Sequence, residues 1–274
     1  EETWKLLSRW ITPEDGTLWR QASYRFHALV AADWRRGRVF LAGDAAHMQP
    51  PFLGQGMCQG VRDAANLSWK LATVLAGDVQ GEAAQALLDS YGHERKAHVR
   101  ELTSRIKGVG AVICERDEAK ARERDAALLA QCGGVVKDTP RQDILPPLEH
   151  GLLSGRTTSA RGTLFPQPWL RTAQGEQRMD AVAGHGWRLV MLEAADEAAD
   201  VGFTGLQPVD LALTPELHGV VAQWMQRHGC VAALVRPDHY VYGIATHGAE
   251  IAALVEEAAA ELGLRHRCPS TLDA

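Results

Sequence analysis

Hydrophobic and polar positions over the first 115 residues predict strands, loops and helices in alternation. Residues 24–27 are expected to form a strand. Residues 38–42 are expected to form a second strand that is covered on both faces, because their apolar run lacks alternation. A helix is predicted to begin near Met57 and end at Gly77, with apolar positions at helical spacing: Met57, Val61, Ala64, Ala65, Leu71, Val74 and Leu75.

A second, long helix is predicted over residues 82–115. Its apolar stripe consists of Leu88, Tyr91, His98, Leu102, Ile106, Val109 and Ile113. Residues 116–165 are interpreted as a connector, because a mixed-charge helical patch is followed by glycine and proline breakers. The chain is therefore divided into residues 1–115, 116–165 and 166–274.

The last part of the chain has the pattern of a small α/β domain. Strands are expected at residues 187–192 and 209–213, and a hairpin at 231–245 that turns at 236–239. Helices are expected at residues 215–228, with Thr214 as N-cap and Pro215 in the first turn, and at 249–262. With a short helix after the first strand, the order is strand, helix, strand, helix, strand, strand, helix.

Composition indicates a globular protein, since 46% of the 274 residues are apolar and 23% are charged. The net charge of −5 gives no basic footprint for nucleic acid. No apolar run approaches the roughly 20 residues that cross a bilayer, so a membrane partner is not expected. The five scattered cysteines contain no C-x-x-C pair, which argues against a zinc site and favours a cytoplasmic location.

Candidate chemistry lies between the strand at 38–42 and the helix that follows. Asp44 follows the strand, where a carboxylate can bind sugar-like hydroxyls. Gly54 and Gly56 open the helix, where free N–H groups and the helix dipole favour a carbonyl oxygen or an anionic ring. These features predict a crevice for a nucleotide-type cofactor. Taken singly, Gly43–Asp44 could be a simple turn, and the glycine spacing is one residue off the dinucleotide fingerprint.

The amino-acid sequence of this segment resembles the second flavin motif of the FAD-dependent aromatic hydroxylases. These are the flavoprotein monooxygenases related to p-hydroxybenzoate hydroxylase. The resemblance rests on residues 38–47, 50–51, 54–57, 60, 63–64 and 66–71. Residues 114–117, 141–143, 162–168 and 234–238 are most similar to the 3-(3-hydroxyphenyl)propionate hydroxylases within this family. The implied fold is α/β, with the C-terminal part of a Rossmann-like FAD-binding domain followed by a thioredoxin-like domain.

The resemblance implies roles for individual residues. Asp44 would bind the ribityl hydroxyls of FAD, Pro51 would lie beside the isoalloxazine ring, and the backbone from Gly54 to Met57 would face its pyrimidine edge. The implied cofactor-binding residues are Gly43, Asp44, Pro51, Gly54, Gln55, Gly56 and Met57. His47 is expected to be structural, because the implied chemistry needs no imidazole.

The implied reaction is hydroxylation of a small phenolic acid. NADH or NADPH reduces the flavin, O2 adds to it, and the flavin hydroperoxide delivers the hydroxyl group. No protein nucleophile and no catalytic side chain is expected.

Departures from the family pattern leave a second hypothesis open. The opening G-x-G-x-x-G is missing, so the chain resembles the C-terminal half of a hydroxylase and would form one wall of the FAD site. The alternative is a non-catalytic association protein with an incomplete flavin site.

The thioredoxin-like domain is expected to serve structure or homo-oligomerisation rather than redox chemistry. Residues 192–196 lack a C-x-x-C, and Cys230 is expected to be a small core residue. His93 and His98, five residues apart, should lie on different faces of their helix and so bind no common metal.

Overall fold

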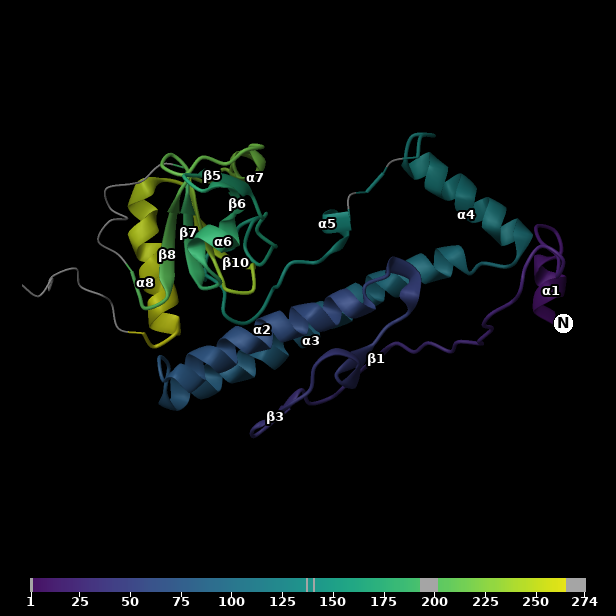
Figure 1. The fold of residues 1–274 in the computed structure, drawn as a ribbon, viewed down its shortest axis with the longest axis horizontal. Coiled ribbons are helices and arrows are strands. Elements are labelled where there is room, and N and C mark those ends of the chain that lie inside the picture. The colour runs from purple at the N-terminus through teal and green to yellow at the C-terminus, as the bar shows by residue number, and fades with distance from the viewer. Residues whose placement is uncertain (1, 137, 140, 193–201, 265–274) are drawn as a thin grey trace, which may run out of the picture.

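The computed structural model describes residues 2–136, 138–139, 141–192 and 202–264. A pair of long helices, α2 (Gly56–Ala76) and α3 (Gly81–Ile113), lies side by side through the middle of the molecule (Figure 1). A four-stranded sheet with its helices lies against one end of this pair. Helices α1 (Glu2–Leu7) and α4 (Glu118–Gln131) lie near the other end.

The segment before α2 consists of short strands and two turns of 3-10 helix. Strand β1 (Leu29–Val30) pairs antiparallel with β4 (His47–Met48), and β2 (Arg35–Arg36) pairs with β3 (Val39–Phe40). The 3-10 turns are η1 (Gly43–Ala45) and η2 (Pro51–Leu53).

Both strands predicted in this segment need correction. Residues 24–27 form no strand, and their aromatic side chains Tyr24 and Phe26 are exposed. The strand expected at 38–42 is reduced to Val39–Phe40, and Val39 is 66% exposed. Within the described residues this strand pairs only with β2. The expectation that it is covered on both faces is therefore wrong, because apolar residues without neighbouring strands cannot form a sheet interior.

Helix α2 has the predicted start and stop but buries a different face. Gly77 ends it with a φ of 82°, as a left-handed C-cap glycine does. Met57, Val61 and Leu75, expected in the core, are all more than half exposed. The buried side chains are instead Gln59, Asp63, Asn66, Trp69 and Lys70. Four of these five are polar and pair with groups on α3, so hydrophobicity alone selects the wrong face.

The apolar stripe of α3 is largely confirmed. Leu88, Tyr91, His98, Leu102 and Ile106 are buried, whereas Ile113 at the helix end is 61% exposed. After α3 the chain continues through α4, which the Asp117 carboxylate caps by accepting from two backbone N–H groups, and through the short helix α5 (Arg141–Ile144).

In the described residues of the C-terminal region, 166–192 and 202–264, the predicted order of strand, strand, helix, strand, strand and helix is present from the strand at 187–191 to the last helix. Hairpin β5 (Trp169–Thr172) and β6 (Gly175–Arg178) and helix α6 (Met179–Ala183), which the hydrophobic pattern did not predict, come first. Strands β7 (Trp187–Met191), β8 (Leu206–Asp210), β9 (Ala232–Val235) and β10 (Val241–Ala245) form a sheet in the order β10-β9-β7-β8. Strand β7 is parallel to β8 and antiparallel to β9. A short helix was expected after the first strand, and residues 192–196 lack a C-x-x-C. Residues 193–201 fall outside the described residues, so the structure does not describe this segment.

Two predicted boundaries in this region are shifted. Strand β8 ends at Asp210 rather than 213. Helix α7 (Val220–His228) begins after Gly219 instead of at Pro215. Pro215 and Leu217 make backbone hydrogen bonds of 2.9 Å with β5, so this segment extends along a strand edge. The Glu216 carboxylate then accepts from two N–H groups in the first turn of α7, and it replaces the expected cap Thr214.

One hydrophobic core joins the C-terminal region to the helix pair. Trp69 of α2 and Leu87 of α3 belong to the same buried cluster as Trp187 of β7, Tyr242 of β10 and the inner face of helix α8 (Ile251–Glu261). A second cluster fills the other side of the sheet and contains Cys230, which is buried as expected. In the part of the chain that the structure describes, no helix combines the length and hydrophobicity needed to cross a membrane.

Candidate cofactor site

Most of the residues expected at the cofactor site surround one cavity. Asp44 of η1, Pro51 of η2 with its C-cap Gly54, and Gly56 and Met57 of α2 line a cavity of about 480 Å³. Gly43 and Gln55 belong to the same loops but do not line it. The structure therefore brings together, around one cavity, five of the seven residues that the sequence analysis named.

Gly43 shapes the loop that carries Asp44. Its φ of 57° lies in the left-handed region that favours glycine. The loop lies close to α2, since a Cβ added to Gly60 would be 3.5 Å from the Gly43 Cα atom. The Gly43 N–H donates to the Asp63 carboxylate of α2 over 3.0 Å. Gly43 thus serves the site through its backbone.

Asp63 is the centre of a buried polar cluster beneath this loop. Its carboxylate binds His47 Nε2 at 2.8 Å and accepts from Arg95 Nε of α3 at 2.9 Å. Arg95 also donates to Gln59 at 2.7 Å, and all these side chains are buried. Burial alone would raise the pKa of Asp63, but the His47 hydrogen bond and the Arg95 charge lower it. The carboxylate therefore stays ionised and ties the loop to both helices.

His47 is buried and contacts Asp63 and Trp34, as a structural residue would, and it also lines the cavity. Its ring is 3% exposed and stacks on Trp34 at 5.6 Å between centroids. His98, on the next helix, contacts Arg95 at 2.9 Å through Nδ1. Burial and the nearby Arg95 and Arg62 charges lower the pKa of His98 to about 2, so it is neutral. His93 is exposed while His98 is buried, so the two do lie on different faces of α3.

The N-terminus of α2 opens on the cavity. Gln55 occupies its N-cap position, and the Gln55 side chain makes no capping hydrogen bond. That side chain is buried, donates to the Leu53 carbonyl and accepts from Arg62, each at 3.3 Å. The first N–H groups of a helix lack intrahelical acceptors, so they can donate to a ligand carbonyl or anion. The exposed Asp44 carboxylate, which lines the same cavity, supplies acceptors for hydroxyl groups.

Several residues of the cavity wall were not expected at the site, among them residues 24–27 and Gln49. Residues 24–27, expected as a strand, line the cavity as an extended segment. Gln49 also lines it, and neither polar atom of its side-chain amide has a hydrogen-bond partner within the described residues. An unpartnered buried amide costs free energy unless a ligand or water satisfies it. The hydrogen-bond donors and acceptors of this cavity thus fit a ligand that has both a carbonyl-bearing ring and hydroxyl groups.

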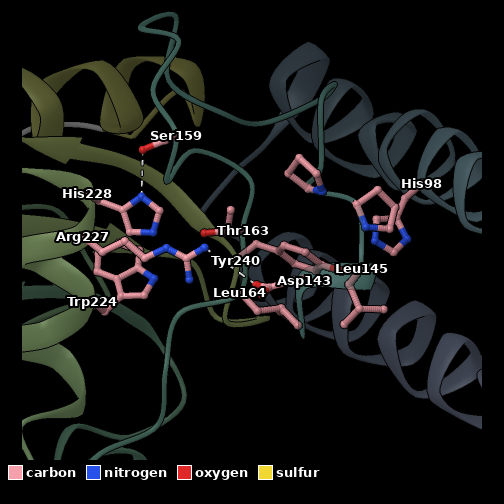
Figure 2. Close-up of a pocket in the computed structure, with 12 residues that line it drawn as sticks. His98, Asp143, Leu145, Ser159, Thr163, Leu164, Trp224, Arg227, His228 and Tyr240 are labelled. Carbon is pink, nitrogen blue, oxygen red and sulfur yellow. Dashed lines mark hydrogen bonds and ion pairs between the residues drawn. The ribbon is translucent and has the colours of Figure 1, made fainter. Parts of the chain in front are cut away.

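A second cavity, of about 250 Å³, lies between α3, the connector and the C-terminal region (Figure 2). Ser159 Oγ lies 2.8 Å from His228 Nδ1, and Arg227 lies 3.8 Å from Asp143. Burial and the Arg227 charge lower the pKa of His228. The expected cofactor residues do not line this cavity, so it is distinct from the candidate site.

Comparisons with known proteins identify both parts of the chain. Residues 10–106 match the FAD binding domain family, and residues 162–261 match the HcaD C-terminal domain family. The chain is 39% identical over 272 residues to a probable NADH-specific resorcinol 4-hydroxylase of Rhodococcus jostii (strain RHA1), covering 94% of this chain and 49% of that protein. It is 32% identical over 291 residues to a 3-(3-hydroxy-phenyl)propionate/3-hydroxycinnamic acid hydroxylase of Mycobacterium avium (strain 104), covering 93% and 49%.

Solved structures share the fold. Aklavinone-11 hydroxylase, crystallised with FAD and aklavinone, matches with a TM-score of 0.61 at 23% identity, over 86% of this chain and 46% of that one. The chain spans about half the length of the curated relatives it matches.

Proposed function

Because this chain belongs to the FAD-dependent aromatic hydroxylases, we propose that it supplies one wall of the FAD site in an enzyme that hydroxylates a phenolic ring with NADH and O2. One observation carries the proposal: Asp44, Pro51, Gly54, Gly56 and Met57 line a single cavity at the start of α2. A non-catalytic association protein would have no need of this arrangement. We propose residues 1–115 as the flavin-binding part, 116–165 as a connector and 166–274 as the thioredoxin-like part.

Each expected residue has a role that its surroundings support. Asp44 would accept hydrogen bonds from the ribityl hydroxyls, because its carboxylate is exposed on the cavity wall. The backbone from Gly54 to Met57 would face the pyrimidine edge of the ring, where the helix dipole favours negative charge. Pro51 would pack beside the ring. Gly43 acts through its anchored backbone, and Gln55 through its main chain, since its side chain is turned into the protein.

Bound FAD would supply the redox and oxygen-transfer chemistry, while the protein orients and shields it. The substrate class follows from the two relatives, one named for resorcinol and the other for 3-(3-hydroxy-phenyl)propionate. Both compounds carry a ring hydroxyl meta to another substituent. We therefore propose a small meta-substituted phenol as substrate, and NADH as the reductant because one relative is named as NADH-specific.

The test is made on the natural polypeptide purified from its source cells. We expect a yellow protein whose NADH consumption rises with resorcinol or 3-(3-hydroxyphenyl)propionate, and a product that has gained one oxygen atom. The para isomer 3-(4-hydroxyphenyl)propionate is the control and should leave NADH consumption at its basal rate. A colourless protein that does not take up added FAD would instead support the association hypothesis.

We further propose a cytoplasmic location and a role of the C-terminal region in self-association. The location is supported by the four cysteines in the described residues, which form no disulfide. Cys230 is unsuited to redox work, because burial raises the pKa of its thiol to about 11.

A further inference from the structure

A second buried polar cluster joins the helix pair to the C-terminal region. Glu94 of α3 is its centre and accepts from Lys70 of α2 at 2.8 Å and from Arg236 at 2.6 Å. Asp238 accepts from Arg236 at 2.7 Å, and Asn66 of α2 donates to both Glu94 and Asp238 at 2.7 Å. These five side chains are all buried.

The charges in this cluster balance one another. Burial would raise the pKa of Glu94, but Arg236 and Lys70 overcome this effect and lower it to about 2. Burial opposes the charge on Arg236 as well, yet Asp238 and Glu94 raise its pKa above the ordinary value. Breaking such a pair destabilises the fold strongly, because it leaves an uncompensated buried charge. The cluster therefore fixes the position of the C-terminal region on the helix pair α2 and α3.

Arg236 and Asp238 lie in the turn between β9 and β10, at residues 236–239. The turn is itself fixed, since the His239 N–H donates to the Arg236 carbonyl at 3.0 Å. Arg188 of β7 donates to the same carbonyl at 2.8 Å. Tyr240, directly after the turn, contacts His98 of α3 edge-on at 6.2 Å between ring centroids (Figure 2). The turn thus extends from the sheet and contacts both α2 and α3.

The two buried clusters adjoin each other on both helices. Asn66 lies one helical turn after Asp63 on α2, and Glu94 directly precedes Arg95 on α3. One cluster holds the C-terminal turn through Asn66 and Glu94, and the other holds the cofactor loop through Asp63 and Arg95. A shift of α3 against α2 would disturb both sets of hydrogen bonds at once.

We propose that Arg236 and Asp238 are positioning residues for the cofactor loop: they fix α2 against α3 and so hold the Asp63–Arg95 pair that carries Gly43 and Asp44. The importance of the loop for FAD rests on the proposed function. The C-terminal region then has a task beyond association, since it sets the geometry of a site that it does not line.

The test uses the full chain and two readouts. Amide hydrogen exchange at residues 43–47 reports the loop directly, because the Gly43 N–H is bound to Asp63. Fluorescence titration with FAD reports the site. We expect Arg236→Gln and Asp238→Asn to speed exchange at Gly43 at least 10-fold and to weaken FAD binding at least 10-fold, with Arg236→Lys in between. Asp238→Asn preserves the shape of the side chain, so this variant is expected to fold even if Arg236→Gln does not.

Val221→Ala is the matched control. Val221 is buried in the cluster on the other side of the sheet and so destabilises the C-terminal region without touching the turn. It should leave exchange at Gly43 unchanged. Unchanged exchange in a folded Asp238→Asn variant, or equal acceleration in Val221→Ala, would overturn the inference. If the wild-type chain and the natural protein both fail to bind FAD, the proposed function fails, while the exchange readout still decides the role of the turn.

Discussion

At the scale of single residues, Asp44 allows ligand binding to be separated from folding. Its carboxylate is exposed, so Asp44→Ala should change stability by no more than about 0.5 kcal/mol. Loss of a hydrogen bond to a charged group, worth about 1.5–3 kcal/mol, should weaken FAD binding at least 10-fold. FAD titration and thermal unfolding measure the two effects. Asp33→Ala, which removes an exposed carboxylate 3.6 Å from Arg36, should change neither; unaltered FAD affinity in Asp44→Ala would contradict the role of Asp44.

Asp63 should behave in the opposite way, because it is buried and paired. Asp63→Asn leaves the Arg95 guanidinium buried without its carboxylate, and we expect a loss of about 3–5 kcal/mol in the free energy of unfolding. Urea unfolding measures it. Asp89→Asn removes the partner of Arg35 in a pair whose carboxylate is 58% exposed, and should cost less than about 1 kcal/mol. Equal losses of unfolding free energy in the two variants would show that the buried Asp63–Arg95 pair stabilises the protein no more than the exposed pair does.

At the scale of elements, the packing of α3 against η2 sets the place of Pro51 and Gly54. A Cβ on Gly110 would lie 2.3 Å from the Phe52 ring of η2, so Gly110→Ala must displace this ring. We expect a loss of about 1–3 kcal/mol from overpacking, together with weaker FAD binding. Gly108→Ala on the same helix meets no atom within 4 Å and should stabilise α3 by up to about 1 kcal/mol. Urea unfolding and FAD titration of both variants test this; a Gly110→Ala variant that binds FAD normally would show that η2 can move freely.

Sequence patterns predicted the elements whose signals are local. The Gly77 stop of α2 and the apolar stripe of α3 depend on neighbouring residues, and both were confirmed. The start of α7 depends on the pairing of Pro215 and Leu217 with β5, which lies far away in sequence, so propensity placed it wrongly. The strand expected at 24–27 was wrong for the same reason, since an extended segment forms a strand only where it pairs with another one.

The candidate site shows the same limit. Asp44 and the glycines were found because their chemistry and spacing are visible in the sequence. Asp63, Asn66 and Glu94 were missed, because a polar residue on a helix normally indicates a solvated face. Asp63 pairs with Arg95, Asn66 with Asp238 and Glu94 with Arg236, each from another element, so only the three-dimensional structure shows that these polar side chains are buried.

At the scale of the whole molecule, the Glu94 cluster makes the contact between the helix pair and the C-terminal region sensitive to acid. The pKa of Glu94 is lowered from 4.5 to about 2 in the folded protein, despite burial, by Arg236 and Lys70. A depressed carboxyl pKa contributes stability above the unfolded value, and this contribution is lost as the pH falls through the folded value. Wild type should therefore lose stability between about pH 4.5 and pH 2.

Glu94→Gln isolates this contribution. The variant should be less stable than wild type at pH 7, because Arg236 and Lys70 lose their shared carboxylate. Its stability should fall less steeply than that of wild type from pH 4.5 to pH 2, since it has no carboxyl to protonate at this position. Urea unfolding of both proteins across this range, followed by tryptophan fluorescence, measures the difference. Trp69 and Trp187, which pack edge-on at 5.8 Å across the contact, report its separation; parallel pH profiles would mean that Glu94 is not the acid-sensitive link between the two parts.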